Sequence, residues 1–281
     1  MSVRQPVGAR QEGPEPWTML ASRVLAPNPS PFSLEGTNSY LLRDPASYRV
    51  VVVDPGPAAA LHLHELVAHG QVELILLTHA HNDHVESAPQ LARMTGAPVR
   101  AADTALCIGA PALHDGEELH VGGTRIQVVA TPGHTADSVC FRLPDDRLAD
   151  VHPGAGSMLT GDTILGRGYS VVAPPDGSLR AYFDSLDRLQ DAGDLTVLPG
   201  HGPLRGSLRM VAAEYAQHRR ARLARVERVA RELDASDAGP ATVEKVADIV
   251  YAHVPADLRA GAEMAVAAQL TYLLEAPAGR A

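Results

Sequence analysis

Short apolar runs separated by glycine, proline and small polar residues dominate the first two thirds of the chain. Runs rich in valine, leucine and isoleucine are typical of strands, and they predict strands over residues 39–42, 49–53, 72–78, 99–102, 124–130, 138–143 and 195–198. Residues 58–68, 87–94 and 178–192 predict helices, and in the last of these Leu179, Tyr182, Leu186 and Leu189 share one side. The pattern therefore predicts a β-rich domain with interleaved helices.

The pattern changes after Leu204, and the residues that follow are predicted to be mainly helical. Residues 208–233 have a helical period, residues 235–240 predict a loop, and further helices are predicted up to Tyr251 and over 262–274. Between Arg205 and Arg231, eight arginines against two glutamates give a net charge of +6, which leaves −15 on the rest of a chain whose total is −9. We therefore divide the chain into a flexible leader over 1–17, a main domain over 18–204 and a helical C-terminal domain over 205–281.

Composition favours a cytoplasmic enzyme that does not bind to a membrane. No apolar run approaches the roughly 18 residues that span a bilayer. The first seventeen residues contain Glu12 and Glu15 and lack the apolar core of a signal peptide. Cys107 and Cys140 are the only cysteines, too few for a disulfide framework.

The run Thr-His-Ala-His-Asn-Asp-His, from Thr78 to His84, carries the most specific chemical signal. It places His79, His81, Asp83 and His84 directly after the predicted strand 72–78. Side chains beyond the carboxyl end of a strand are where α/β sheets usually place their chemistry. Imidazole and carboxylate without thiolate form a ligand set for zinc, iron or manganese. Two such ions need about seven ligands in all, so further ligands are expected downstream.

Four further motifs each put a histidine or an acid after an apolar segment and close to a glycine. They are Asp54 in Val-Asp-Pro-Gly, His134 in Pro-Gly-His, Asp162 in Gly-Asp and His201 in Pro-Gly-His-Gly. A tight turn at the glycine is expected to present each side chain at the end of a strand. The other eight histidines lack such a context and are interpreted as ordinary surface or core residues: His62, His64, His69, His114, His120, His152, His218 and His253.

In order and spacing, these five motifs resemble the metallo-β-lactamase fold superfamily over roughly residues 20–204. The resemblance implies an α+β fold, the αββα sandwich, in which two sheets pack face to face with helices outside. It implies that one metal ion is held by His79, His81 and His134, a second by Asp83, His84 and His201, and that Asp162 bridges both. Asp54 is implied as a carboxylate that orients a histidine, with capping of the turn at Pro55–Gly56 as its alternative role.

The resemblance also implies the chemistry. The metals are expected to be two Zn²⁺ ions, with iron or manganese as alternatives. They would share a hydroxide whose pKa is lowered to near neutrality and which attacks an acyl carbon or a phosphorus atom. Asp83 would then take the proton of the nucleophile or hold its orientation.

Two segments further resemble the lactamase-B-like branch, whose animal member is a mitochondrial single-strand-specific endoribonuclease. They are the segment from Asn28 to Tyr40 and the C-terminal region from Pro240 to Pro255, which resembles a small winged-helix domain that lacks its wing hairpin. The branch implies single-stranded RNA as the substrate. The arginine-rich face would guide such a polyanion, or it is merely a solvated face. The acidic balance of the remaining chain argues against broad, tight nucleic-acid binding.

Other functions stay open at this point. A thioester hydrolase of the hydroxyacylglutathione hydrolase type shares all seven ligands, and its substrate would be a thioester or another small ester. True β-lactamases of this fold place a cysteine where this chain has Asp162, so β-lactam hydrolysis is disfavoured. In a non-catalytic nucleic-acid-binding module, some of the seven metal ligands would be expected to be replaced by other residues. We therefore predict a zinc-dependent hydrolase, first as an endoribonuclease and second as a thioester hydrolase, whose oligomeric state the sequence does not indicate.

Overall fold

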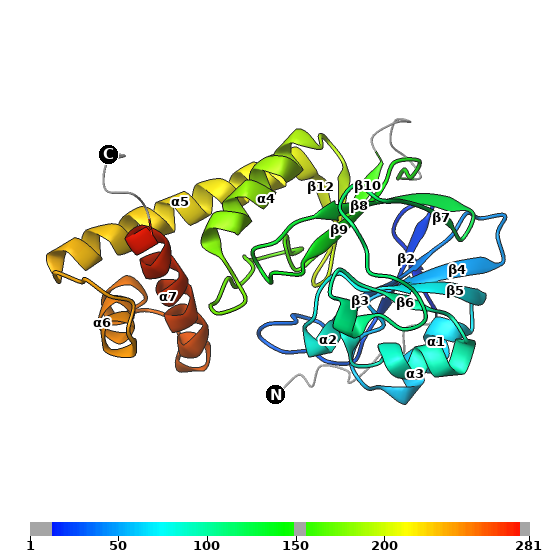
Figure 1. The fold of residues 1–281 in the computed structure, drawn as a ribbon, viewed down its shortest axis with the longest axis horizontal. Coiled ribbons are helices and arrows are strands. Elements are labelled where there is room, and N and C mark those ends of the chain that lie inside the picture. The colour runs from blue at the N-terminus through cyan, green and yellow to red at the C-terminus, as the bar shows by residue number, and fades with distance from the viewer. Residues whose placement is uncertain (1–12, 149–155, 276–281) are drawn as a thin grey trace, which may run out of the picture.

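Two six-stranded β-sheets form the centre of the protein. The computed structural model describes residues 13–148 and 156–275. The strand order is β1-β2-β3-β4-β5-β6 in the first sheet and β12-β11-β10-β9-β8-β7 in the second. Figure 1 shows the two sheets facing each other, with the first mostly in blue and cyan and the second mostly in green. Most neighbouring strands are antiparallel, whereas β4, β5 and β6 run parallel to one another, as do β10 and β11.

The strand bounds follow the apolar runs of the sequence. The first sheet consists of β1 (Glu15–Pro16), β2 (Ala21–Leu25), β3 (Asn38–Leu42), β4 (Arg49–Val53), β5 (Gln71–Leu76) and β6 (Val99–Arg100). The second consists of β7 (Glu118–Val121), β8 (Thr124–Ala130), β9 (Val139–Leu143), β10 (Ser157–Gly161), β11 (Thr196–Pro199) and β12 (Arg205–Ser207). Every residue of β3 and β10 is buried. This burial on both faces explains why these strands do not alternate between apolar and polar residues.

Three apolar clusters separate four layers of secondary structure. Residues such as Leu42, Leu76, Phe141 and Leu159 fill the space between the two sheets. The outer face of the first sheet packs against α1 (Ala60–Val67) and α3 (Ala88–Thr95). The outer face of the second packs against α4 (Leu179–Asp191) and the start of α5 (Leu208–Glu232). The predicted αββα sandwich is therefore confirmed.

The C-terminal segment is helical, as predicted. The far half of α5 packs against α6 (Pro240–Val250) and α7 (Arg259–Glu275) through a separate apolar cluster that includes Val226, Val246 and Val266. Figure 1 shows α5 extending from the sandwich to these helices. The winged-helix resemblance stays a prediction.

Domain boundaries differ from those expected. β12 pairs with β11, and the first half of α5 packs against α4, so the sandwich extends beyond residue 204. At the other end, β1 pairs with β2, so the last residues of the predicted leader join the first sheet, while residues 1–12 and His152 lie outside the described part. Within the described residues, no helix is long and apolar enough to span a membrane.

Candidate metal centre

The loops that follow five strands carry the predicted site residues to one edge of the sandwich. Asp54 follows β4, and His134, Asp162 and His201 follow β8, β10 and β11. His79 and His81 lie in the loop after β5, which leads into the short helix α2 (Asn82–Val85) that carries Asp83 and His84. Because these five strands point the same way across the two sheets, their carboxyl ends meet at this edge.

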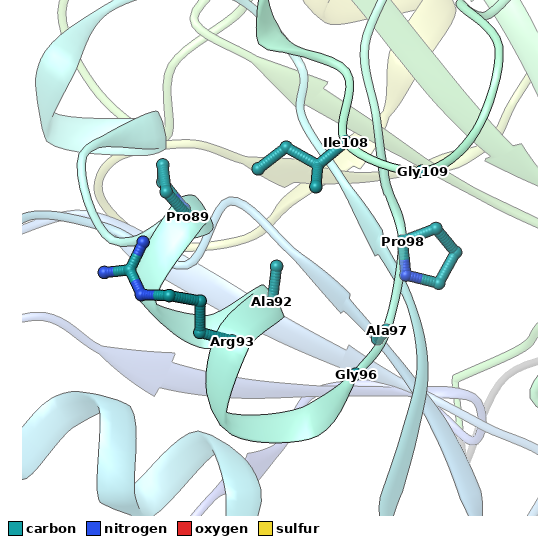
Figure 2. A pocket seen from close by; sticks show the side chains of 8 residues that line it. All are labelled: Pro89, Ala92, Arg93, Gly96, Ala97, Pro98, Ile108 and Gly109. Carbon is teal, nitrogen blue, oxygen red and sulfur yellow. The ribbon is translucent and has the colours of Figure 1, made fainter.

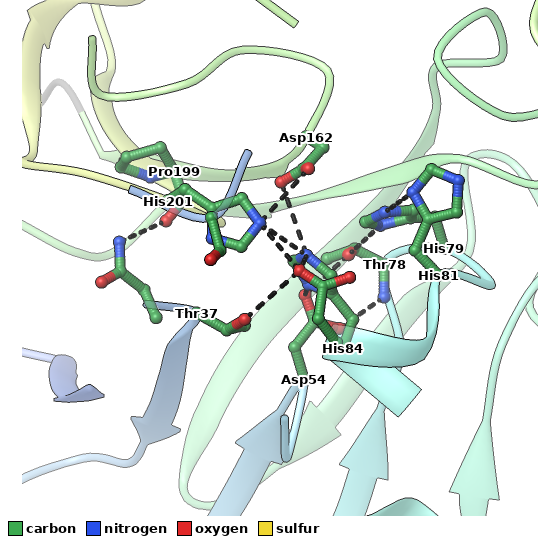
Figure 3. A network of polar contacts seen from close by, with 12 residues as sticks. Thr37, Asp54, Thr78, His79, His81, His84, Asp162, Pro199 and His201 are labelled. Atoms are coloured by element: carbon green, nitrogen blue, oxygen red, sulfur yellow. Dashed lines mark hydrogen bonds and ion pairs between the residues drawn. The ribbon is translucent and has the colours of Figure 1, made fainter. Parts of the chain in front are cut away.

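The candidate ligand atoms converge in overlapping groups of three. The members of each group lie within 4.8 Å of one another, and the groups are His79, His81 and His134; His79, His84 and Asp162; and Asp83, His84 and His201. Asp162 lies between the first and the last, since its Oδ2 is 3.9 Å from His134 Nε2 and 3.4 Å from His201 Nε2. Figure 3 shows Asp162 between His201 on one side and His79 with His81 on the other. All seven predicted ligands therefore lie in one cluster.

Asp54 forms hydrogen bonds with Thr78 and with one of the candidate ligands, His84. Its Oδ1 accepts a hydrogen bond from the backbone N–H of Thr78 at 2.8 Å, and its Oδ2 accepts one from the Thr78 hydroxyl at 2.7 Å. The same Oδ2 lies 2.8 Å from His84 Nδ1, and Figure 3 shows Asp54 on the side of His84 opposite Asp162. A carboxylate at Nδ1 fixes the tautomer that leaves Nε2 free to bind a metal. Asp54 thus contacts both Thr78 and His84, and its role as the carboxylate that orients a metal-binding histidine stays a prediction.

Backbone carbonyls orient two further histidines in the same way. His134 Nδ1 donates to Val171 O at 2.6 Å, and His201 Nδ1 donates to Gly36 O at 3.1 Å. A carbonyl only accepts hydrogen bonds, so in the neutral rings both Nε2 atoms present lone pairs to the cluster. His201 Nε2 lies 3.2 Å from His84 Nε2. Two lone pairs that close repel each other unless a proton or a metal cation lies between them.

The electrostatics of the cluster favour positive charge. Burial alone would lower the pKa of His201, but the carboxylates of Asp162 and Asp83 raise it to about 11. Burial alone would raise the pKa of Asp162, but His201 and His84 hold it well below its ordinary value. Asp162 Oδ1 is buried without a hydrogen-bond partner within the described chain. The donor set, the facing lone pairs and this unpaired oxygen all fit divalent cations.

The sequence did not identify the groups that hold the ligands in place. Asn38 Nδ2 donates to Pro199 O and Gly202 O, both at 2.9 Å, and so fixes the loop that carries His201. Thr37 Oγ1 lies 3.5 Å from Asp83 Oδ2. Ser170 Oγ lies 3.0 Å from His134 Nδ1. Thr37 and Asn38 lie in the segment from Asn28 to Tyr40 that carries the family resemblance, whereas no sequence signal indicated Ser170.

A glycine makes the close approach of two loops possible, and this leads to a testable prediction. A Cβ atom on Gly200 would lie 2.5 Å from Asp162 Oδ1 and 2.9 Å from His84 Cε1. We expect Gly200→Ala to displace both side chains and to lower the metal content of the purified protein to less than half of the wild-type value, measured by elemental analysis. Gly206→Ala is the control, because a Cβ there meets nothing within 4 Å. Equal metal content in both variants would contradict a cation at this position.

A separate hollow of about 390 Å³ lies between α3 and the segment around Gly109. Figure 2 shows its lining, which includes Ala92, Pro98 and Ile108. None of its lining residues is a candidate ligand. The chemistry is therefore assigned to the cluster at the sheet edge.

Comparison with known proteins supports the same conclusion. The family model of the metallo-β-lactamase superfamily matches residues 33–201. The lactamase-like protein adaB of Aspergillus niger is 34% identical over 213 residues, which cover 73% of this chain and 62% of adaB. The atrochrysone carboxyl ACP thioesterase of Aspergillus chevalieri is 31% identical over 252 residues, which cover 84% of this chain and 74% of that protein.

A solved structure matches most of the fold. The metallo-β-lactamase family protein of Thermus thermophilus superposes with a TM-score of 0.70 at 26% identity, over 91% of this chain and 93% of that one. The aligned part of the chain is longer than residues 33–201, which the family model matches. The chain therefore belongs to the metallo-β-lactamase superfamily, whose hydrolytic fold binds divalent metals.

Proposed function

We propose that this protein is a dinuclear metal-dependent hydrolase, with zinc as the expected metal, that cleaves acyl thioesters. The observation that carries the proposal is the convergence of seven imidazole and carboxylate side chains in groups that share members. His79, His81 and His134 would hold one cation, Asp83, His84 and His201 the other, and Asp162 would contact both. Cations in such a site supply Lewis acidity, which lowers the pKa of water and stabilises negative charge on a carbonyl oxygen.

Asp83 is the residue of this set best placed to handle a proton. Its side chain is 36% exposed, whereas those of His84 and His201 are buried. Burial would raise the pKa of Asp83, but the hydrogen bond with His201 lowers it below the ordinary value of a carboxyl group. Asp83 is therefore ionised at neutral pH and can accept a proton from an attacking water or hold that water by a hydrogen bond.

The relative named as an acyl carrier protein thioesterase supports the choice of a thioester, because its similarity covers 84% of this chain. The arginines of residues 205–231 provide less support for RNA than their number suggested. Four of the eight contact other parts of the protein: Arg219, Arg220, Arg222 and Arg225. Arg205 and Arg231 pair with the two glutamates of the same segment, Glu214 and Glu227. Arg219 is buried rather than part of a polar face.

Single-stranded RNA stays the second candidate, favoured by the net charge of +6 on this segment. The two substrates are distinguished by assaying metal-loaded protein on an acyl pantetheine thioester, with release of thiol as the signal, and on a single-stranded oligoribonucleotide. We expect thiol release whose rate Asp83→Asn lowers by roughly 10²–10⁴-fold. RNA cleavage without any thiol release would overturn the thioester proposal and favour the second candidate.

Charge reversal on α5 gives an independent prediction about the substrate. Arg225 and Arg228 are exposed, and for a thioesterase acting on a neutral pantetheine thioester we expect Arg225→Glu/Arg228→Glu to leave turnover unchanged. For a ribonuclease, the same variant would weaken RNA binding and reduce the salt slope of log affinity by roughly 1 per lost phosphate contact. Arg209→Glu, at the opposite end of the helix, serves as the control for a change in net charge.

A further inference from the structure

Three residues of α5 hold the segment that follows Asp162. The Tyr215 hydroxyl accepts a hydrogen bond from Leu165 N at 2.9 Å and donates one to Gly168 O at 2.9 Å. The His218 ring stacks on Tyr169, with 3.5 Å between ring centroids and 2° between planes. Positions 215, 218 and 219 share one face of a helix, and that face covers residues 165–170.

Arg219 makes the last of these contacts, a hydrogen bond from its guanidinium to Ser170 O. Only 6% of Arg219 is exposed, and its guanidinium carbon lies 5.2 Å from the centroid of the Tyr182 ring. Within the described residues no carboxylate forms an ion pair with it. A buried cation that lacks such a partner is unfavourable unless its hydrogen bonds compensate. An apolar side chain would fill this position at less cost, so packing alone does not explain the arginine.

The segment that Arg219 holds is in direct contact with a candidate ligand. Ser170 Oγ lies 3.0 Å from His134 Nδ1, and His134 Nδ1 donates to Val171 O at 2.6 Å. The Ser170 carbonyl belongs to the peptide group that joins Ser170 to Val171. The Ser170 side chain and the Val171 carbonyl flank this peptide group, so a hydrogen bond at the Ser170 carbonyl restricts the backbone that carries both groups in contact with the His134 ring.

We propose that Arg219, together with Tyr215, is a positioning residue for the metal centre. It holds the backbone of Ser170 and Val171 beside His134, so that α5, on the outer face of the second sheet, controls how tightly the cation at His134 is bound. The inference rests on the proposed function, because it assumes that His134 is a ligand. Groups that orient a metal-binding histidine typically contribute a factor of about 10–100 to metal affinity.

The test compares metal affinity in Arg219→Gln, Tyr215→Phe and Ser170→Ala with that in Arg220→Gln. Arg220 is the matched control, because it neighbours Arg219 but faces Asp187 and Phe183 instead of residues 165–171. Zn²⁺ affinity is measured by competition with a chromophoric chelator, and the absorption bands of bound Co²⁺ report the ligand geometry. Thermal unfolding of the metal-stripped proteins records stability separately.

We expect Arg219→Gln and Ser170→Ala each to weaken binding of one of the two cations by about 10–100-fold, with a smaller loss in Tyr215→Phe and none in Arg220→Gln. The double variant Arg219→Gln/Ser170→Ala should be little worse than the worse single variant, because both changes act through His134.

A purely structural role would lower the unfolding temperature of the metal-stripped protein and leave both affinities and the Co²⁺ bands unchanged. That result in Arg219→Gln and Tyr215→Phe would overturn the inference and leave the proposed function intact. If Arg219→Gln does not fold, Tyr215→Phe decides the question, since it removes a single hydroxyl group. Failure of the wild-type protein to bind two cations would instead overturn the proposed function itself.

Discussion

Removal of the Asp162 carboxylate is expected to empty both metal positions at once. Its Oδ2 lies 3.4 Å from His201 Nε2 and 3.9 Å from His134 Nε2, so one side chain reaches both groups of ligands. Asp162→Ala also removes one of the three carboxylates that the described residues place near these imidazoles, and leaves Asp54 and Asp83 beside His84 and His201. Elemental analysis of the purified variant should give close to no bound metal, against close to two ions per chain in the wild-type protein, and hydrolytic turnover should be lost with it.

Asp184→Ala is the matched control for this change. Asp184 is an exposed carboxylate on α4, so its removal alters the net charge by the same amount without touching the cluster. We expect its metal content and turnover to equal those of the wild-type protein. An unchanged metal content in Asp162→Ala would exclude Asp162 from the site and would leave two separate groups of ligands rather than a shared one.

The site was more predictable from the sequence than the fold around it, because the signals for each ligand lie in residues next to it in the chain. Each ligand follows an apolar run, and a turn near it is marked by a neighbouring glycine. Gly133 and Gly161, for example, both have positive φ. Such local signals predict that the ligand lies at the end of a strand. The long strands were predicted for the same reason. Five strands of the described part of the chain were not predicted: β1, β2, β7, β10 and β12. Each contains polar or small residues and is recognised only through its pairing with a neighbouring strand.

Contacts between distant segments account for what the sequence did not indicate. Ser170 and Val171 orient His134, which precedes them by more than thirty residues, and neither belongs to a recognisable motif. The arginine-rich face was likewise misjudged at Arg219, which the net charge alone placed among solvated residues. Arg219 is buried against Tyr182, and only the packing of α5 on α4 reveals that position. The number of arginines in a helix can be counted from the sequence, but their net charge does not indicate which of them face the solvent.

The largest effect on turnover with folding intact is expected for Asp83→Asn. The amide keeps the size of the side chain and can still contact His201 Nε2, which lies 3.2 Å from Asp83 Oδ2. It cannot accept the proton of an attacking water, because it carries no negative charge. A positioned acid–base group contributes roughly 10²–10⁴-fold to turnover, and we expect kcat to fall by about that factor.

Because Asp83 is itself a candidate ligand, the measurement must separate catalysis from metal binding. Metal content, thermal unfolding and kcat should be measured on the same preparation, at metal concentrations that saturate the variant. Glu86→Gln is the control: Glu86 is exposed beside the same short helix and accepts a hydrogen bond from Ala58 N at 2.9 Å, away from the cluster. We expect Glu86→Gln to retain wild-type turnover. More than half of wild-type turnover in metal-saturated Asp83→Asn would show that the carboxylate does not handle the proton, and that role would then pass to solvent or substrate.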